Sequence, residues 1–161
     1  LWCHREPDLE LGGAVWPATA AADRRTALLF LDLDRFKQVN DRWGHAVGDA
    51  VLRVVAGRIT AVAATGSWSA ARIGGDEFVV LGAGGRDLGD GAVAMAERLV
   101  AELTEPIEVA TTDGETVTVT VGTSIGVAVT ADDLDGLLEL ADGAMYAVKA
   151  AGGRAWSAHL P

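Results

Sequence analysis

Two pairs of carboxylates in this 161-residue chain are placed where they could hold a metal ion. Asp32 and Asp34 end an apolar run, and Asp76 and Glu77 follow two glycines, which have no side chains to obstruct a ligand. If the two segments are neighbouring strands, the four acids converge, and a hard cation such as Mg²⁺ would relieve their repulsion. Each acid alone is better explained as a solvated strand end. Together, the two pairs favour a metal site.

The segments that carry these acids are predicted to be strands. Residues 27–33 are rich in Leu and bounded by polar residues, which indicates a buried central strand with side chains alternating between two faces. Residues 68–73 and 77–81 flank Gly74–Gly75, and this pattern predicts a tight hairpin with the second acid pair at its tip.

The remaining elements follow from hydrophobic periodicity. Helical spacing of apolar residues predicts helices over 51–62, 95–103 and 134–148. Alternation predicts strands over 107–110, 116–121, 125–129 and 155–159. This order indicates an α+β layer structure with an antiparallel-rich sheet. Residues 1–26 are interpreted as a tail with at most a short Ala-rich helix.

Composition limits the classes of function. The length fits one domain, and 13 Lys and Arg against 23 Asp and Glu give a net charge of -10, which disfavours binding to nucleic acid. No apolar run approaches the roughly 18 residues that suggest a membrane span. The chain begins with Leu, so we expect a fragment of a longer protein without a signal peptide. Cys3 is the single cysteine, which fits a reducing compartment.

Residues 72–78, Arg-Ile-Gly-Gly-Asp-Glu-Phe, resemble the signature of the GGDEF domain, the diguanylate cyclase family. Further segments resemble other motifs of the family in the same order, and the resemblance spans about residues 27–155. These motifs are Leu31–Lys37, Val39–Asp41, Gly44–His45, Gly48–Asp49, Ser124–Val127 and Ala141–Lys149.

The resemblance implies a palm-like fold, ferredoxin-like and related to nucleotide cyclases, over residues 27–161. It also implies an activity, the condensation of two GTP into cyclic di-GMP with release of pyrophosphate across a homodimer. The expected cofactor is Mg²⁺, with Mn²⁺ as an alternative. An upstream sensor domain is expected in the full-length chain, and the expected location is the cytoplasm, either free or as the cytoplasmic domain of a membrane-anchored protein.

The family's metal ligands correspond to Asp32, the Leu33 carbonyl and Asp76, with Glu77 beside them. General-base duty falls to Asp76 or Glu77, and the sequence does not choose between them.

Asn40 and Asp49 match the family's guanine-reading positions. A carboxylate at Asp49 would accept the N1 and N2 protons that guanine offers and adenine does not in that pattern. The alternative for Asp49 is a helix N-cap, because it precedes the helix predicted from Val51. His45 is interpreted as a turn residue without chemistry.

Phosphate-binding positions of the family correspond to Phe36, Lys37 and Lys149. Lys149 could otherwise be an ordinary dipole partner at a helix C-terminus. Arg154 is the expected companion arginine, although it lies one residue beyond the commonest spacing.

Two features depart from the family's pattern. Residues 65–68, Thr-Gly-Ser-Trp, replace the Arg-x-x-Asp of the inhibitory product site, so no such site is expected. The lead-in helix is shortened and interrupted by Pro17. This second departure keeps an alternative open: a catalytically silent module that binds GTP and acts as a regulatory or interaction domain.

Overall fold

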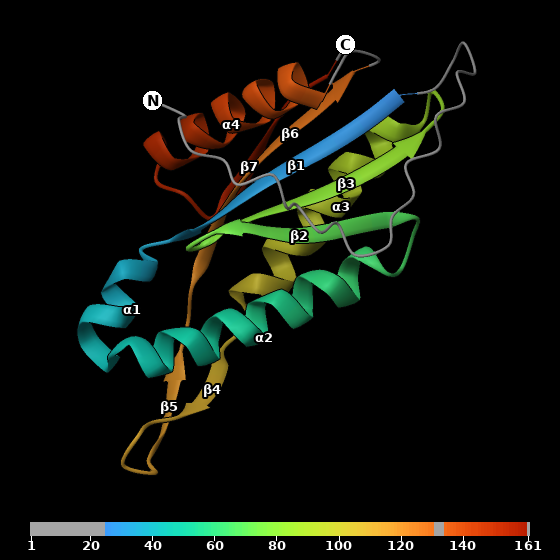
Figure 1. Ribbon diagram of the computed structural model, residues 1–161. Helices are drawn as coiled ribbons and strands as arrows, with labels where there is room; N and C mark the ends of the chain where they lie inside the picture. Colours follow the sequence, from blue (N-terminus) through green and yellow to red (C-terminus); the bar gives the residue numbers. More distant parts are fainter. Residues whose placement is uncertain (1–24, 131–133, 161) are drawn as a thin grey trace.

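The computed structural model describes residues 25–130 and 134–160, and Figure 1 shows their arrangement. The elements in chain order are β1 (Arg25–Asp34), α1 (Phe36–Trp43), α2 (His45–Ala63), β2 (Trp68–Gly74), β3 (Glu77–Gly84), α3 (Leu88–Thr104), β4 (Ile107–Ala110), β5 (Thr116–Val119), β6 (Gly122–Thr130), α4 (Leu134–Ala150) and β7 (Ala155–His159). Arg25 and Thr26, predicted as tail, are the first residues of β1. The interpretation of residues 1–24 lies outside the described part of the chain.

The central sheet has five strands in the order β2-β3-β1-β6-β7, so β1 is the middle strand. β1 is antiparallel to both β3 and β6, whereas β7 is parallel to β6. β4 and β5 form a separate two-stranded ribbon that projects from the body of the domain (Figure 1). The predicted α+β class with an antiparallel-rich sheet is therefore confirmed.

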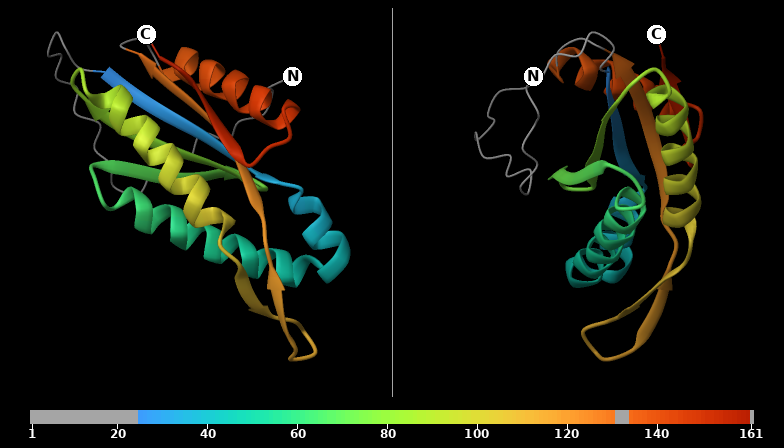
Figure 2. Two further views of the ribbon diagram at one scale, coloured as in Figure 1. Left: turned by 180° about the vertical axis from the view of Figure 1, so that it is seen from behind. Right: turned by 90° about the vertical axis from the view of Figure 1, so that its right-hand side faces the viewer.

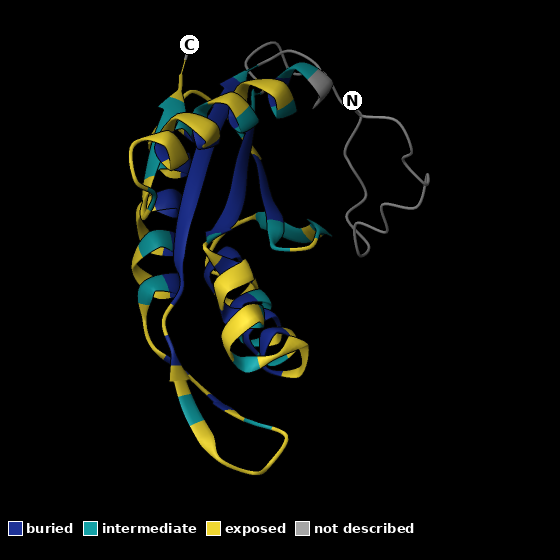
Figure 3. Cartoon of the chain, turned by 90° about the vertical axis from the view of Figure 1, so that its left-hand side faces the viewer, coloured by how far each residue is buried: buried dark blue, intermediate teal, exposed yellow. Residues whose placement is uncertain are grey.

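Helices cover both faces of the sheet, as Figure 2 shows. Leu29, Leu31 and Leu33 point into the core shared with α2 and α3, while Leu28 and Phe30 point into the core beneath α4. All five leucine and phenylalanine side chains are at most 1% exposed. The three middle strands, β3, β1 and β6, are accordingly buried over most of their length and form the dark blue layer in Figure 3. The alternation predicted for β1 is confirmed, and it gives the strand two apolar faces.

Several predicted boundaries differ from the structure. α3 begins at Leu88, seven residues before its predicted start at residue 95, and β5 ends at Val119 rather than at residue 121. α2 begins at His45, six residues before the predicted start, because Gly44 adopts a positive φ of 81° and separates α2 from α1. Asp49 therefore lies inside the helix, and the N-cap alternative for it is wrong. In the hairpin, the strand pairing shifts between Arg72 and Gly74, so Gly74 pairs with Glu77 and the two-residue turn is Gly75–Asp76.

None of the helices in the described part of the chain has the length and apolarity that crossing a bilayer requires.

The contact between β6 and α4 depends on Gly126. A Cβ there would lie 1.8 Å from the Ala141 carbonyl oxygen and 2.4 Å from the Met145 nitrogen, both backbone atoms that cannot swing away. We expect Gly126→Ala to lower the free energy of unfolding by about 1–3 kcal/mol or more, as overpacking does. Gly143→Ala is the matched control, since nothing lies within 4 Å of its Cβ; in a helix it should stabilise by up to about 1 kcal/mol. Urea denaturation of both variants measures the difference, and equal stabilities would contradict this account of the interface.

Candidate active site

The acidic end of β1 meets the turn of the β2–β3 hairpin. Asp32 lies directly opposite Glu77 in the antiparallel pairing of β1 and β3. The Leu33 amide donates a hydrogen bond of 3.2 Å to the carbonyl oxygen of Asp76, which ties the turn to the strand. The two segments are thus neighbours, as the sequence analysis required for the acids to converge.

Asp32 is a buried carboxylate with only one oxygen satisfied. Its side chain is 9% exposed, and its Oδ2 forms an ion pair of 2.6 Å with the Lys149 ammonium, which lies on α4. Oδ1 is buried without a hydrogen-bond partner. Burial raises the pKa of Asp32, with smaller upward contributions from Asp76 and Asp34, and Lys149 opposes the rise.

Glu77 shares this environment. Burial raises the pKa of its carboxyl, and the negative charges of Asp32, Asp76 and Asp142 raise it further, against a smaller opposing effect of Lys149. Two neighbouring carboxyls with raised pKa values are typical of functional sites, where charges are held close against their repulsion.

The acids partly fit a hard cation. The unpartnered Oδ1 of Asp32 is an oxygen ligand of the kind that Mg²⁺ prefers. Among the residues that the structure describes, no three His, Cys, Asp or Glu side chains form a metal-binding group. The predicted set needs only two such side chains, Asp32 and Asp76, with the Leu33 carbonyl as third ligand. Asp34 does not join them, because its Oδ1 accepts from the Ser124 hydroxyl at 2.6 Å and its Oδ2 accepts from the Arg154 amide at 2.7 Å.

A cavity of about 320 Å³, the α1–α2 cavity, opens beside the hairpin turn. It brings together five of the predicted site residues. Its lining is Phe36, Lys37, Asn40, His45, Asp49, Leu52, Arg72, Gly75 and Asp76.

Three lining residues had no predicted role: His45, Leu52 and Arg72. Arg72 was part of the hairpin signature, and the structure shows what it does. Its Nε and one terminal nitrogen donate to the Gly75 carbonyl at 2.9 and 2.6 Å, so the guanidinium braces the turn that presents Asp76. His45 was interpreted as a turn residue and instead is the first residue of α2, on the cavity wall.

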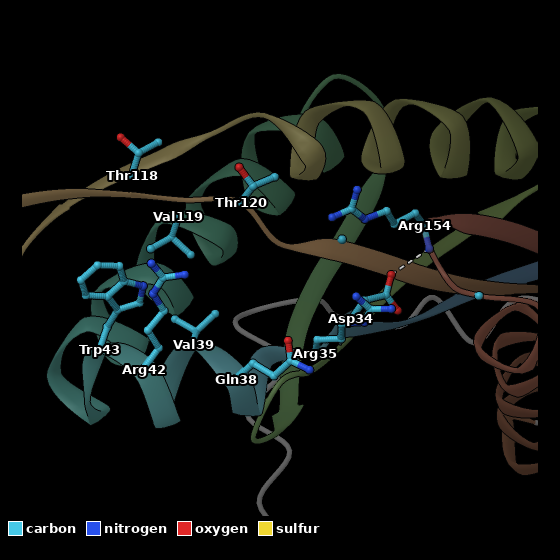
Figure 4. Close-up of a pocket in the computed structure, with 12 residues that line it drawn as sticks. Asp34, Arg35, Gln38, Val39, Arg42, Trp43, Thr118, Val119, Thr120 and Arg154 are labelled. Carbon is cyan, nitrogen blue, oxygen red and sulfur yellow. Dashed lines mark hydrogen bonds between the residues drawn. The ribbon is translucent and has the colours of Figure 1, made fainter.

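Arg154 does not line the α1–α2 cavity with the predicted phosphate-binding residues Phe36 and Lys37. It lines a second cavity of about 560 Å³, on the β5 side of α1, and is not part of the α1–α2 cavity lining. Figure 4 shows its side chain there, with its backbone amide bonded to Asp34. The segment before Arg154 is one residue longer than the commonest spacing in the family. In this segment, Gly152, Gly153 and Arg154 all adopt positive φ.

The family model described as "Diguanylate cyclase, GGDEF domain" matches residues 8–155 of this chain. Among curated relatives, the diguanylate cyclase TpbB of Pseudomonas aeruginosa is 44% identical over 128 residues, covering 76% of this chain and 28% of that protein. The bifunctional diguanylate cyclase/cyclic di-GMP phosphodiesterase MucR, also of Pseudomonas aeruginosa, is 42% identical over 130 residues, covering 79% and 18%. The chain thus spans less than a third of the length of these two relatives.

Solved structures agree with this match. The crystal structure of the GGDEF domain of TpbB has a TM-score of 0.71 at 39% identity, covering 85% of this chain and 82% of that one. The coiled coil and GGDEF domain of DgcB from Caulobacter crescentus, in complex with c-di-GMP, has a TM-score of 0.73 at 32% identity, covering 84% and 70%.

Asp32, Asp76 and Glu77 form an acid cluster whose negative charges repel one another. This repulsion predicts that Glu77→Gln stabilises the fold at neutral pH. Because the folded-state pKa of Glu77 lies above its ordinary value of 4.5, ionisation of this carboxyl costs stability above the raised pKa, and the cost is absent below 4.5. Removing a like charge directly opposite Asp32 should add about 0.2–1 kcal/mol at pH 7. Thermal unfolding of wild type and variant from pH 7 to pH 4 checks this.

The gain should shrink as the pH falls through the raised pKa towards 4.5. Glu97→Gln, an exposed position on α3, is the matched control and should show no such pH-dependent gain. A gain for Glu77→Gln that stays constant down to pH 4 would contradict the charge explanation.

Proposed function

Since the chain belongs to the GGDEF domain family of diguanylate cyclases, we propose that it condenses two GTP molecules into cyclic di-GMP and releases pyrophosphate. The observation that carries the proposal is the α1–α2 cavity, where the predicted guanine-reading residues and two of the four predicted phosphate-binding residues, Phe36 and Lys37, lie beside Asp76. The proposed domain comprises residues 25–161, because β1 begins at Arg25 and not at the predicted residue 27.

The guanine base is proposed to bind between α1 and α2. Asn40 and Asp49 line the cavity from the two helices and supply a carboxamide and a carboxylate. The carboxylate accepts the N1 and N2 protons of guanine, which supports a preference for GTP over ATP. Asn40 packs closely on Gly48, where a Cβ would fall 1.8 Å from the Asn40 Oδ1. The Asn40 carboxamide therefore occupies space that a side chain at residue 48 would fill.

The phosphates are proposed to lie between the start of α1 and the acid cluster. Phe36 offers its backbone amide and Lys37 its ammonium from the first turn of α1. Lys149 neutralises Asp32 in this structure, and a phosphate would compete with that carboxylate for the ammonium. Arg154 can act as a companion to Lys149 only if its guanidinium reaches past the end of β1, because it lines the other cavity.

Asp32, Asp76 and the Leu33 carbonyl are the proposed holders of Mg²⁺ or Mn²⁺. When bound, such a cation stabilises charge on the phosphates and lowers the pKa of the attacking 3′-hydroxyl. Asp76 and Glu77 are the candidates for accepting the hydroxyl proton. The raised pKa of Glu77 favours it, since a base works best when its pKa lies near the operating pH.

Each chain offers one such cavity in its described part, so cyclisation of two GTP requires a second copy facing the first. We propose a homodimer for catalysis, an upstream sensor domain in the full-length protein, and a cytoplasmic location for the domain.

A second candidate function is a silent GTP-binding module. The pairing of Lys149 with Asp32 and the position of Arg154 in another cavity favour it. Both candidates bind GTP, and only the first converts it.

Measurement of GTP turnover distinguishes the cyclase from the silent GTP-binding module. Incubation of the concentrated 161-residue chain with GTP and Mg²⁺, followed by chromatography, should yield cyclic di-GMP and pyrophosphate. The Asp76→Ala/Glu77→Ala double variant should lose activity by about 10²-fold or more, because it removes both candidate bases and one proposed ligand. Glu97→Ala/Glu102→Ala, two exposed acids on α3, carries the same charge change and should keep full activity. GTP bound without conversion by the wild type would leave the silent module as the function.

Gly48→Ala tests the guanine site. The new methyl group must displace the Asn40 carboxamide, the end of a flexible side chain, so the fold should survive while GTP binding weakens. We expect about a tenfold loss of affinity, the worth of one good hydrogen bond. Gly57→Ala on the same helix has nothing within 4 Å of its Cβ and should bind GTP as the wild type does. Isothermal titration calorimetry with GTP measures the affinity of both variants. Equal affinities would contradict the proposal that guanine binds beside Asn40.

A further inference from the structure

The second cavity is called the α1–β5 cavity. Only one of its lining residues, Arg154, has a role in the proposed reaction, and that role requires its guanidinium to reach past the end of β1. It is larger than the α1–α2 cavity, at about 560 Å³ against about 320 Å³. Its lining includes Asp34, Arg35, Arg42, Thr118, Thr120 and Arg154. Figure 4 shows Arg42 and Trp43 at one end, Arg154 at the other, and Thr118 and Thr120 on the β5 side. This volume suits a small molecule.

The cavity wall concentrates positive charge in an acidic chain. Arg35, Arg42 and Arg154 contribute three guanidinium groups, and within residues 25–130 and 134–160 none of them forms an ion pair with a carboxylate. Arg42 lies over the Trp43 ring, 4.7 Å from its centroid, which leaves its N–H edges available. Like charges gathered without counter-charges repel each other, so an anionic ligand would stabilise them.

The single carboxylate of the wall is already occupied. Asp34 accepts from the Ser124 hydroxyl and from the Arg154 backbone amide. It therefore holds the segment that carries Arg154 and forms no ion pair with the guanidinium groups. Counting side chains, the wall carries three positive charges and one negative charge, a balance that fits a ligand with at least two negative charges.

The backbone supports a functional origin of this arrangement. Arg35 and Arg154 have φ values of 59° and 57°, and they are the non-glycine residues with positive φ in the described part of the chain. Such a conformation disfavours residues with a Cβ and is retained where the surroundings or a function require it. Both strained residues line the same cavity.

We propose that the α1–β5 cavity binds a small phosphorylated anion carrying at least two negative charges, at a site separate from the α1–α2 cavity. Guanidinium groups bind phosphate oxygens through paired, charge-assisted hydrogen bonds, and threonine hydroxyls add donors. α1 separates the two cavities, with Phe36, Lys37 and Asn40 on one face and Arg35, Gln38 and Arg42 on the other. An anion bound by Arg35 and Arg42 would therefore contact the same helix that carries Lys37 and Asn40, and it would influence the position of these two residues.

Nuclear magnetic resonance of the 161-residue chain tests the proposal with inorganic pyrophosphate as the probe, without divalent cations. The side-chain Nε signals of Arg35 and Arg42 and the indole signal of Trp43 should shift and saturate. The Arg35→Ala/Arg42→Ala variant should bind pyrophosphate at least about tenfold more weakly at this site, because each charge-assisted hydrogen bond is worth more than one tenfold step. Arg98→Ala, an exposed arginine on α3, is a control and should not change the affinity.

Three outcomes would overturn the proposal. Shifts confined to Lys37 and Asn40 would place the anion in the α1–α2 cavity. Equal affinity of the double variant and the wild type would remove the guanidinium groups from binding. Shifts reproduced by sodium chloride at matched ionic strength would reduce the effect to screening. Because no catalysis is measured, failure of the proposed cyclase activity does not affect the result.

Discussion

The ion pair between Asp32 and Lys149 joins the centre of the sheet to the last helix, and the site depends on it. Asp32 sits where the middle strand ends, with a buried carboxylate whose second oxygen has no partner. Leaving a buried polar atom unsatisfied costs about 1–3 kcal/mol, and Glu77 and Asp76 add repulsion. A fold selected for stability alone would fill this position with an apolar residue, as it does from Ala27 to Leu31. This cost fits the proposed role of Asp32 in holding a cation.

The short helix α1 connects this acid cluster to two cavities. It follows β1 after one residue, so the strand's position in the core fixes where the helix begins. Phe36 and Val39 anchor it in the core beneath the sheet. With only eight residues, it presents different side chains to each cavity, and any shift of its axis changes both. The residues proposed to bind the nucleotide and the arginines of the α1–β5 cavity are therefore connected through one small, well-anchored helix.

The sequence predicted the parts of the fold that have a strong period. The Leu-rich alternation of β1, the two strands of the hairpin and the stripe of α4 were located correctly, because each buries a regular apolar face. The hairpin turn itself lies one residue later than the predicted glycine pair. It misplaced the start of α2, since residues 45–49 carry no apolar stripe and Gly48 serves the contact with Asn40 rather than the helix. It also did not anticipate the α1–β5 cavity. Arg35, Thr120 and Arg154 are far apart in the chain, have no shared spacing, and meet only because β6 and β7 run alongside the end of β1.

The net charge of the chain does not describe the local charge around its two cavities. The total of -10 argues against polyanionic partners, yet six of the 13 basic residues gather around α1 and the end of β1: Arg35, Lys37, Arg42, Arg72, Lys149 and Arg154. At physiological salt, charges are screened beyond about 8 Å, so a ligand in either cavity responds to these neighbours more than to distant surface acids. The acidic remainder of the surface repels nucleic acid, whose many phosphates must contact a wide area. A small phosphorylated molecule needs only the local patch, so the acidic total charge does not conflict with the proposed binding of GTP.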